Sequence, residues 1–195
     1  MEEAICYYMK KCFNNKWITS YDGNISYKTV NNDLVYITPS SVKKQHLTKE
    51  QIILLSIVDS KIIKNNYNLQ PSGELDFHMK IHSHYNFNNN TNLCIIHVHP
   101  PNILAYVGLL KTNRELDTIK MIFPEINIKI GRNVDYYTAK TPILAEKVYE
   151  NIIGNDIIAL KRHGIVAIGD NFEDVMDNIN TLEYYCKIFL KEKEN

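Results

Sequence analysis

The chain has 195 residues, with 22 basic and 22 acidic side chains, so its formal net charge is zero. A chain of this length is expected to form a single domain with a substantial core, spanning residues 1–195. A neutral chain lacks the positive field that attracts nucleic acids or anionic membranes, so neither is an expected partner.

Short hydrophobic runs predict a soluble, cytoplasmic protein. The run Ile52–Val58 is far shorter than the roughly 20 residues that a membrane helix needs, and the acidic start Met1-Glu2-Glu3 is unlike a signal peptide. The cysteines have no CxxC spacing and fall in predicted helices or buried strands, which predicts reduced thiols in the core. They are Cys6, Cys12, Cys94 and Cys186.

The first third of the chain predicts a helix followed by strands. Apolar residues recur at three- and four-residue steps in Glu3–Asn14, which predicts a helix packed on a sheet. Alternation in Ile25–Val30, turn residues at 31–33 and a second run Leu34–Thr38 predict a β-hairpin. The run Ile52–Val58 predicts a third strand.

Helices and strands then alternate. Pro71 and Gly73 precede a predicted helix over about Leu75–Tyr85, and the Asn-rich residues 86–92 predict a polar loop. Leu93–Val98 predicts an apolar strand that ends at two prolines. The next helix is predicted from Ile103, Leu104, Val107 and Leu110.

The last third continues this alternation, whereas residues 116–140 show no clear pattern. A helix is predicted over 141–153, from the Thr-Pro start to Gly154, followed by strands Ile157–Leu160 and Ile165–Ile168. A final helix begins near Asn171, with one apolar face. Because helices and strands interleave without a linker or repeat, the fold class predicted is α/β.

Two histidines stand two positions apart in the strand-like segment around His97 and His99. Side chains at this spacing leave the same face of a strand, so both imidazoles can bind one metal ion. His163 stands at a strand junction before Gly164, whose missing side chain allows a close approach. Further ligands must come from elsewhere in the chain.

Small polar residues in three loops are candidates for an anion site. Ser72 and Glu74 lie in a Pro-Ser-Gly-Glu turn that presents a hydroxyl and a carboxylate at a helix start. Two more loops could surround a phosphate with hydroxyls and amides. They are Asp22-Gly23-Asn24 and Thr38-Pro39-Ser40-Ser41.

The remaining histidines have simpler interpretations. His46, His82 and His84 are predicted to lie at the surface, in a polar stretch and near a helix end. His78 lies one helical turn after Glu74 and is expected to pack in the core, with contact to the site as the alternative.

Five motifs in order resemble the class II aldolase/adducin family. They are GNIS (23–26), ITPSS (37–41), PSGE (71–74), HVHPP (97–101) and RHG (162–164). The likeness extends from about Trp17 to the last helix and includes Phe123-Pro124-Glu125 and the region of Glu183. It implies a three-layer α/β/α domain with a central mixed, largely antiparallel sheet, assembled as a homotetramer with active sites at subunit boundaries.

The resemblance also implies roles for individual residues. His97, His99 and His163 match zinc ligands, and Glu74 matches the catalytic acid/base that can also coordinate the ion. Manganese, iron or cobalt would suit the same ligands. The positions that match those binding the substrate phosphate are Gly23, Asn24, Ser40, Ser41, Ser72 and Gly73.

The implied activity is zinc-dependent cleavage of a small ketose 1-phosphate into dihydroxyacetone phosphate and an aldehyde. The expected binding partner is therefore this small phosphorylated substrate. Alternatives within the family are a methylthioribulose-1-phosphate dehydratase, favoured by Trp17-Ile18-Thr19 and Ser41-Val42-Lys43-Lys44, and a sugar-phosphate 4-epimerase. An adducin-like assembly module without catalysis is the alternative from another class.

Two departures from the family pattern affect the phosphate loops. Ser41 stands where the family usually has Gly, and Gly73 stands where it usually has a second Ser, which removes one hydroxyl. The family's C-terminal tail, with its aromatic proton donor, is expected to have no counterpart in this chain.

Overall fold

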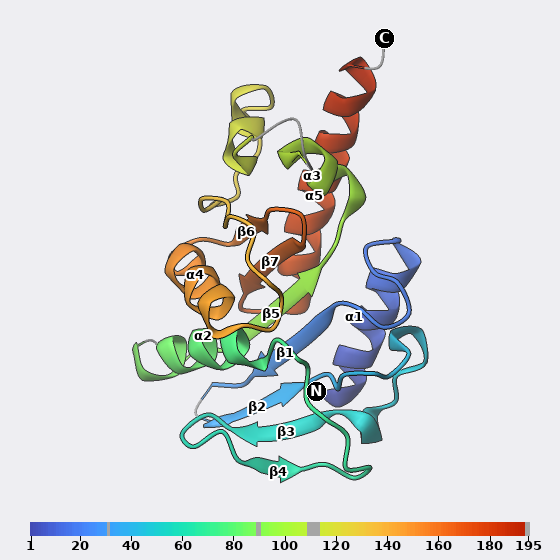
Figure 1. The fold of residues 1–195 in the computed structure, drawn as a ribbon, viewed down its shortest axis with the longest axis vertical. Coiled ribbons are helices and arrows are strands. Elements are labelled where there is room, and N and C mark those ends of the chain that lie inside the picture. Colours follow the sequence, from blue (N-terminus) through green and yellow to red (C-terminus); the bar gives the residue numbers. More distant parts are fainter. Residues whose placement is uncertain (31, 89–90, 109–113, 194–195) are drawn as a thin grey trace.

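The computed structural model describes residues 1–30, 32–88, 91–108 and 114–193 (Figure 1). Within these residues, seven strands form one sheet in the order β4-β3-β2-β1-β5-β7-β6.

The strands are β1 (Asn24–Lys28), β2 (Leu34–Ile37), β3 (Ile53–Ser56), β4 (Ile62–Lys64), β5 (Leu93–Val98), β6 (Ile157–Leu160) and β7 (Gly164–Gly169). The α-helices are α1 (Glu2–Asn14), α2 (Leu75–Asn88), α3 (Pro101–Val107), α4 (Pro142–Ile152) and α5 (Phe172–Lys193). Short 3₁₀ helices are η1 (Lys44–His46), η2 (Lys49–Gln51) and η3 (Leu116–Met121).

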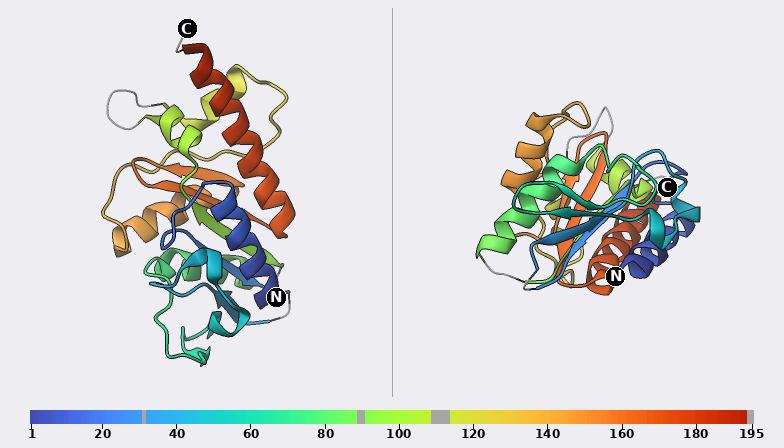
Figure 2. Two further views of the ribbon diagram at one scale, coloured as in Figure 1. Left: turned by 90° about the vertical axis from the view of Figure 1, so that its right-hand side faces the viewer. Right: turned by 90° about the horizontal axis from the view of Figure 1, so that it is seen from below.

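Helices cover both faces of the sheet, which confirms the predicted three-layer α/β/α architecture (Figure 2). Helices α1, α3 and α5 pack with Ile25, Ile96 and other strand residues in one core. Helices α2 and α4 pack with Ile95, Val166 and their neighbours on the opposite face. The strands of the described sheet pair antiparallel, and parallel pairing is confined to two isolated bridges from Ile130 and Val134 to β6.

Most predicted elements are present, with local differences. The hairpin is confirmed, since Ser26 of β1 lies opposite Ile37 of β2, although Asn31 of its predicted turn lies outside the described residues. Helix α2 extends to Asn88, beyond the predicted end, because no Gly or Pro interrupts it there. Residues 89–90 of the predicted loop and Leu110 also lie outside the described residues.

Strand β4 and the short helices η1 and η2 were not predicted. Strand β4 is an edge strand with two exposed residues, so its sequence does not show the alternation of a half-buried strand. Cys12, Cys94 and Cys186 are buried free thiols as predicted, whereas Cys6 is only half-buried. Within the described ranges, none of the helices has the length and apolar character needed to cross a bilayer.

The register of β1 and β5 brings polar residues together beneath α2. Asn24 pairs with His97, and Ser26 pairs with Ile95. Because side chains alternate along a strand, Ile25 and Ile96 enter the core under α1, α3 and α5, while Asn24, Ser26 and His97 face the other side. A row of polar groups therefore lies between the sheet and α2.

Helix α3 begins directly after the predicted metal-binding segment, and a carboxylate from α5 caps it. Glu183 accepts hydrogen bonds from the backbone N–H groups of Asn102 and Ile103, at 3.1 and 2.9 Å, and from the Asn102 side chain at 2.7 Å. These backbone donors have no partner within the helix, so Glu183 satisfies groups that would otherwise be left open.

Replacement of Glu183 by Ala is expected to lower the free energy of unfolding by about 2 kcal/mol, because a charged acceptor of several hydrogen bonds is lost. Urea unfolding measures this change. Asp177→Ala, at an exposed position of the same helix, is the matched control and should change stability by less than about 0.5 kcal/mol. Equal effects of the two variants would contradict the capping role.

Candidate active site

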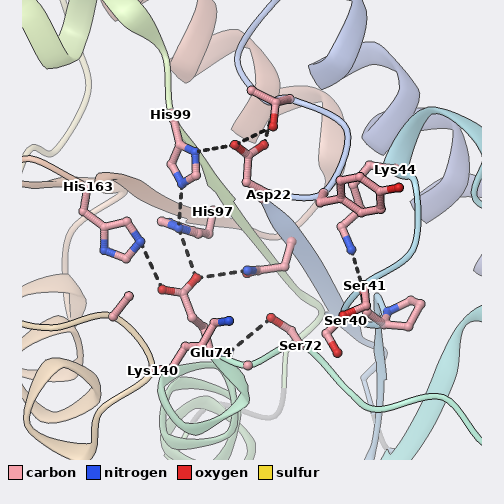
Figure 3. A pocket seen from close by; sticks show the side chains of 17 residues that line it. Asp22, Ser40, Ser41, Lys44, Ser72, Glu74, His97, His99, Lys140 and His163 are labelled. Atoms are coloured by element: carbon pink, nitrogen blue, oxygen red, sulfur yellow. Dashed lines mark hydrogen bonds and ion pairs between the residues drawn. The ribbon is translucent and has the colours of Figure 1, made fainter.

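A pocket of about 630 Å³ lies where β5 ends and β1 begins (Figure 3). It is lined by all the residues that the sequence assigned to metal, catalysis and phosphate. These are Gly23, Asn24, Ser40, Ser41, Ser72, Gly73, Glu74, His97, His99 and His163. Residues from five separate segments of the sequence therefore meet at one place.

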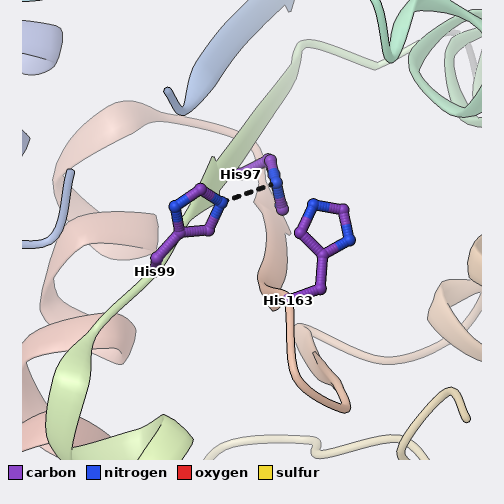
Figure 4. A group of neighbouring side chains, drawn as sticks. All are labelled: His97, His99 and His163. Carbon is purple, nitrogen blue, oxygen red and sulfur yellow. Dashed lines mark hydrogen bonds between the residues drawn. The ribbon is translucent and has the colours of Figure 1, made fainter. Parts of the chain in front are cut away.

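Three histidines form the inner part of this pocket (Figure 4). One ring nitrogen from each of His97, His99 and His163 can be chosen so that all three lie within 4.8 Å of one another. His163 belongs to the three-residue turn between β6 and β7, in which Arg162 adopts a left-handed φ of 60°. The turn places His163 opposite the end of β5.

Gly164 makes the approach of the histidines possible, as the sequence predicted. A Cβ atom at this position would lie 2.5 Å from Cδ2 of His99 and 2.6 Å from the backbone oxygen of Val98. Separations this short are not tolerated, and a backbone atom cannot move away as a flexible side chain can. Any side chain at position 164 would therefore push the β7 turn away from β5.

Hydrogen bonds determine which nitrogen of His97 carries the proton. Its Nδ1 donates to the backbone oxygen of Ile165 at 2.8 Å, because a carbonyl can only accept. Burial lowers the pKa of His97 to about 4, so the ring is neutral at neutral pH and Nε2 holds a lone pair. That lone pair points into the pocket, 3.1 Å from Oε2 of Glu74 and 3.2 Å from Nε2 of His99.

Asp22 acts on His99 in a similar way. Its Oδ2 lies 3.5 Å from Nδ1 of His99, which favours the proton on Nδ1 and leaves the Nε2 lone pair facing His97. Burial tends to raise the pKa of Asp22, but hydrogen bonds from His99 and Thr19 outweigh it and lower the pKa to about 2. The sequence placed Asp22 in a phosphate loop and missed this contact.

Glu74 completes the group of acceptors. Its oxygens lie 3.1 Å from Nε2 of His97 and 3.1 Å from Nε2 of His163, and its Oε2 accepts a hydrogen bond from Nδ2 of Asn24 at 3.1 Å. Burial alone would raise the pKa of Glu74, but the neighbouring His97, His163 and Asn24 hold it well below its usual range. Among the described residues, Oε1 has no hydrogen-bond partner.

The lone pairs on Nε2 of His97 and Nε2 of His99 thus face each other in a mostly buried space, and the first also faces the Glu74 carboxylate. Such an arrangement is repulsive unless a cation lies between the acceptors. Three imidazoles and a carboxylate are ligands that zinc and similar divalent ions accept, with second partners on the outer ring nitrogens. The residues present therefore fit a divalent metal ion.

The loops around the outer pocket are joined by backbone hydrogen bonds. Ser40 N–H donates to Gln70 O at 2.9 Å, and Ser72 N–H donates to Thr38 O at 3.2 Å. Ser41 has a φ of 58°, in the left-handed region, which explains why Gly is usual at this position in the family pattern. The two hydroxyl-bearing loops consequently form one continuous wall.

Two lysines in the pocket were missed by the sequence analysis. Lys44 is only 2% exposed, and its Nζ donates to Pro39 O at 2.5 Å. Burial lowers the pKa of Lys44 to about 8. Lys140 lies over Gly73, where an added Cβ would be 2.7 Å from its Cδ, so it fills the space of the absent Ser side chain.

The prediction that His82 lies at the surface is wrong, since His82 is 0% exposed. Glu74, His78 and His82 follow one another at four-residue steps, so Glu74, just before α2, and the two histidines within α2 lie on the sheet-facing side of the helix. The four-residue spacing was the signal that could have identified His82. His78 is also buried and donates to Asn24, so it both packs in the core and contacts the site.

Comparisons with known proteins agree with this geometry. Residues 3–190 match the family model described as Class II Aldolase and Adducin N-terminal domain. An L-fuculose phosphate aldolase of Methanocaldococcus jannaschii is 32% identical over 93% of this chain and 91% of its own length. A methylthioribulose-1-phosphate dehydratase of Kluyveromyces lactis is 27% identical over 98% of this chain and 96% of its own length.

A solved structure supports the fold. The sugar-phosphate aldolase of Thermotoga maritima superposes with a TM-score of 0.80 and 22% identity, covering 97% of this chain and 93% of that one. The family model matches nearly the whole chain, and the motifs that it shares with the family meet in one pocket. The chain belongs to the class II aldolase and adducin family.

Replacement of Gly164 by Ala is expected to lower the affinity of the three-histidine cluster for a divalent metal ion by about 10- to 100-fold, because the added methyl group displaces His99 and the β5 backbone. Competition with a chromogenic chelator measures the affinity. Gly169→Ala on the same strand serves as the control, because its added Cβ would lie 2.9 Å from a side-chain atom of Val175 and no closer than 4.0 Å to the backbone oxygen of Asn171. Unchanged affinity in Gly164→Ala would show that this close approach does not define the site.

Proposed function

We propose that this protein is a zinc-dependent lyase that cleaves a small ketose 1-phosphate into dihydroxyacetone phosphate and an aldehyde. The observation that carries the proposal is the convergence of acceptor atoms from His97, His99 and His163 beside the Glu74 carboxylate. The name of the M. jannaschii relative supports the aldolase activity.

His97, His99 and His163 would hold the metal ion, with Glu74 as an additional ligand when no substrate is bound. Neutral imidazoles favour zinc, although manganese, iron or cobalt also suits this set of ligands. The ion supplies Lewis-acid polarisation of the substrate carbonyl. The homotetramer that the family resemblance implies stays a prediction.

Glu74 is the proposed proton-transfer group. Cleavage of the carbon–carbon bond frees the proton of the hydroxyl that becomes the aldehyde, while the electron pair of the bond stays on the carbon next to the carbonyl. The Glu74 carboxylate would take up one proton and deliver it to that carbon, so no net proton is gained or lost. In the reverse direction the same carboxylate removes that proton. Oε2 accepts the Asn24 hydrogen bond, whereas Oε1 has only Nε2 of His163, a proposed metal ligand, as a near polar neighbour among the described residues. Oε1 is therefore the oxygen available for the transfer once His163 binds the metal.

The outer pocket would bind the substrate phosphate. Ser40, Ser41 and Ser72 offer hydroxyls, while Gly23 and Gly73 let the backbone come close, and Asn24 adds an amide. The lysine ammonium groups of Lys44 and Lys140 supply positive charge beside these donors. A cation close to the loops offsets the hydroxyl that the chain lacks at position 73.

A dehydratase acting on a sugar 1-phosphate is the second candidate. It is favoured by the K. lactis relative, because the alignment with that protein covers 98% of this chain. Both reactions use a ketose 1-phosphate and move a proton next to a carbonyl, so the same pocket could serve either. They differ in product, because dehydration releases water and leaves the carbon chain intact.

The function is tested by assaying the purified protein for bound metal and by screening ketose 1-phosphates, including methylthioribulose 1-phosphate, with added zinc. We expect about one zinc ion per chain, as a single three-histidine site requires, and release of aldehyde together with dihydroxyacetone phosphate. Dehydration without cleavage would favour the second candidate. Protein without metal or activity under all conditions would support a non-catalytic assembly module.

Replacement of Glu74 by Gln should reduce kcat by about 10²-fold or more, since an amide cannot exchange the proton. The three histidines remain, so zinc should stay bound. Metal analysis and steady-state kinetics measure the two effects. An active Glu74→Gln enzyme would show that another residue moves the proton.

Lys44 is expected to contribute to phosphate binding through its charge. With a pKa of about 8, its ammonium is present below that pH and is lost above it, so kcat/KM should fall as the pH rises through about 8. Lys44→Met should raise KM and abolish this part of the pH profile. Lys43→Met, at the exposed neighbouring position, is the control, and equal profiles for both variants would refute the role.

A further inference from the structure

A chain of buried polar side chains leads away from Glu74 into the space between α2 and β1. Glu74, His78 and His82 follow one another at four-residue steps, whereas Asn24 and Ser26 alternate along β1. The two rows face each other across the interface between helix and sheet. His78, His82 and Ser26 are each 0% exposed, so the part of the chain beyond Asn24 lies within the core.

Four hydrogen bonds connect these groups. Nδ2 of Asn24 donates to Oε2 of Glu74 at 3.1 Å, and its Oδ1 accepts from Nε2 of His78 at 2.5 Å. Nδ1 of His78 lies 2.7 Å from Oγ of Ser26. The same Ser26 oxygen lies 2.7 Å from Nε2 of His82.

The ionised carboxylate sets the direction of every bond in this chain. A carboxylate can only accept, so Asn24 must turn its amide nitrogen to Glu74 and its oxygen to His78. His78 must then donate from Nε2, which leaves a lone pair on Nδ1 for the Ser26 hydroxyl proton. Ser26 in turn accepts from the Nε2–H of His82. All four donors therefore point towards Glu74.

Both imidazoles are neutral, as this assignment requires. Burial lowers the pKa of His78 to about 3 and holds that of His82 well below its usual value. Nδ1 of His82 has no hydrogen-bond partner among the described residues, so the chain ends there on a lone pair. Burying such a series of polar groups costs more than burying apolar side chains of similar size, which argues against a purely space-filling role.

We propose that His78, held in its Nε2–H tautomer by Ser26 and His82, is a positioning residue that fixes the Asn24 amide against Oε2 of Glu74. This leaves Oε1 as the oxygen directed to the reacting carbon. The proposal rests on the function proposed for Glu74, but the hydrogen-bond chain itself can be tested without catalysis. His78 does not line the pocket itself and reaches Glu74 only through Asn24.

The first test is ¹⁵N NMR of the imidazole nitrogens in the full-length, zinc-loaded protein. Spectra of the variants His78→Gln and His82→Gln assign the signals. His78 and His82 are expected to be neutral with the proton on Nε2, whereas His97 should carry it on Nδ1. A His78 ring protonated on Nδ1 alone would overturn the proposal, whatever reaction the protein catalyses.

The second test compares His78→Leu with His78→Gln. The amide of Gln can donate to Asn24 in place of Nε2, whereas Leu cannot. We expect His78→Leu to lower kcat by about tenfold or more, with KM changed by less than about twofold, and His78→Gln to retain most of the activity. Zinc content should be unchanged in both. Equal losses in the two variants, or unchanged kcat in His78→Leu, would overturn the proposal.

Ser26→Ala keeps the test decisive if His78→Leu does not fold, because it removes one hydroxyl from the chain with little change in volume. Like His78→Leu, it should lower kcat and leave KM unchanged, and a wild-type kcat would count against the proposal.

His84→Gln, on another face of α2 where it contacts Tyr149, is the matched control and should leave kcat unaffected. If the wild-type enzyme cleaves no ketose 1-phosphate, the proposed function fails, while the NMR result still decides the hydrogen-bond chain.

Discussion

The proton on Nδ1 of His97 is the constraint on which the site depends. The Ile165 carbonyl holds it in place, and Ile165 lies in β7 directly opposite Val98 of β5. Strand register therefore determines which nitrogen of His97 faces the pocket. The same pairing brings His163 close to His99, because Gly164 leaves room for the turn. A shift of one residue between β5 and β7 would turn these groups to the opposite face of the sheet.

Much of the fold and the site could be predicted from local patterns. Polar and apolar residues do not alternate clearly along Leu93–Val98, so the sequence does not show which side chains face which side of the sheet. His97 and His99 are two positions apart, and that spacing alone predicts that they lie on the same side. The candidate site residues taken from the sequence all line the pocket. Their roles stay predictions, since position in a pocket does not show what a residue binds.

The features that could not be predicted depend on contacts between distant parts of the chain. A lysine is normally exposed, so the burial of Lys44 cannot be recognised before the two serine loops are placed beside it. His82 stands two positions before His84 near a helix end, which favours a surface position, whereas its four-residue spacing from His78 corresponds to the buried position that it has. Strand β4 and the loop contact of Asp22 with His99 likewise depend on tertiary structure.

The histidine side and the serine side of the pocket differ in how many backbone hydrogen bonds hold them in place. His97 lies within a strand paired on both sides, whereas the serines lie on loops joined by a few backbone hydrogen bonds. Changes in loop sequence can thus alter which ligand fits while the histidines keep their geometry. Such a division allows one scaffold to acquire new substrates gradually, and it agrees with relatives of similar sequence that carry the names of different reactions.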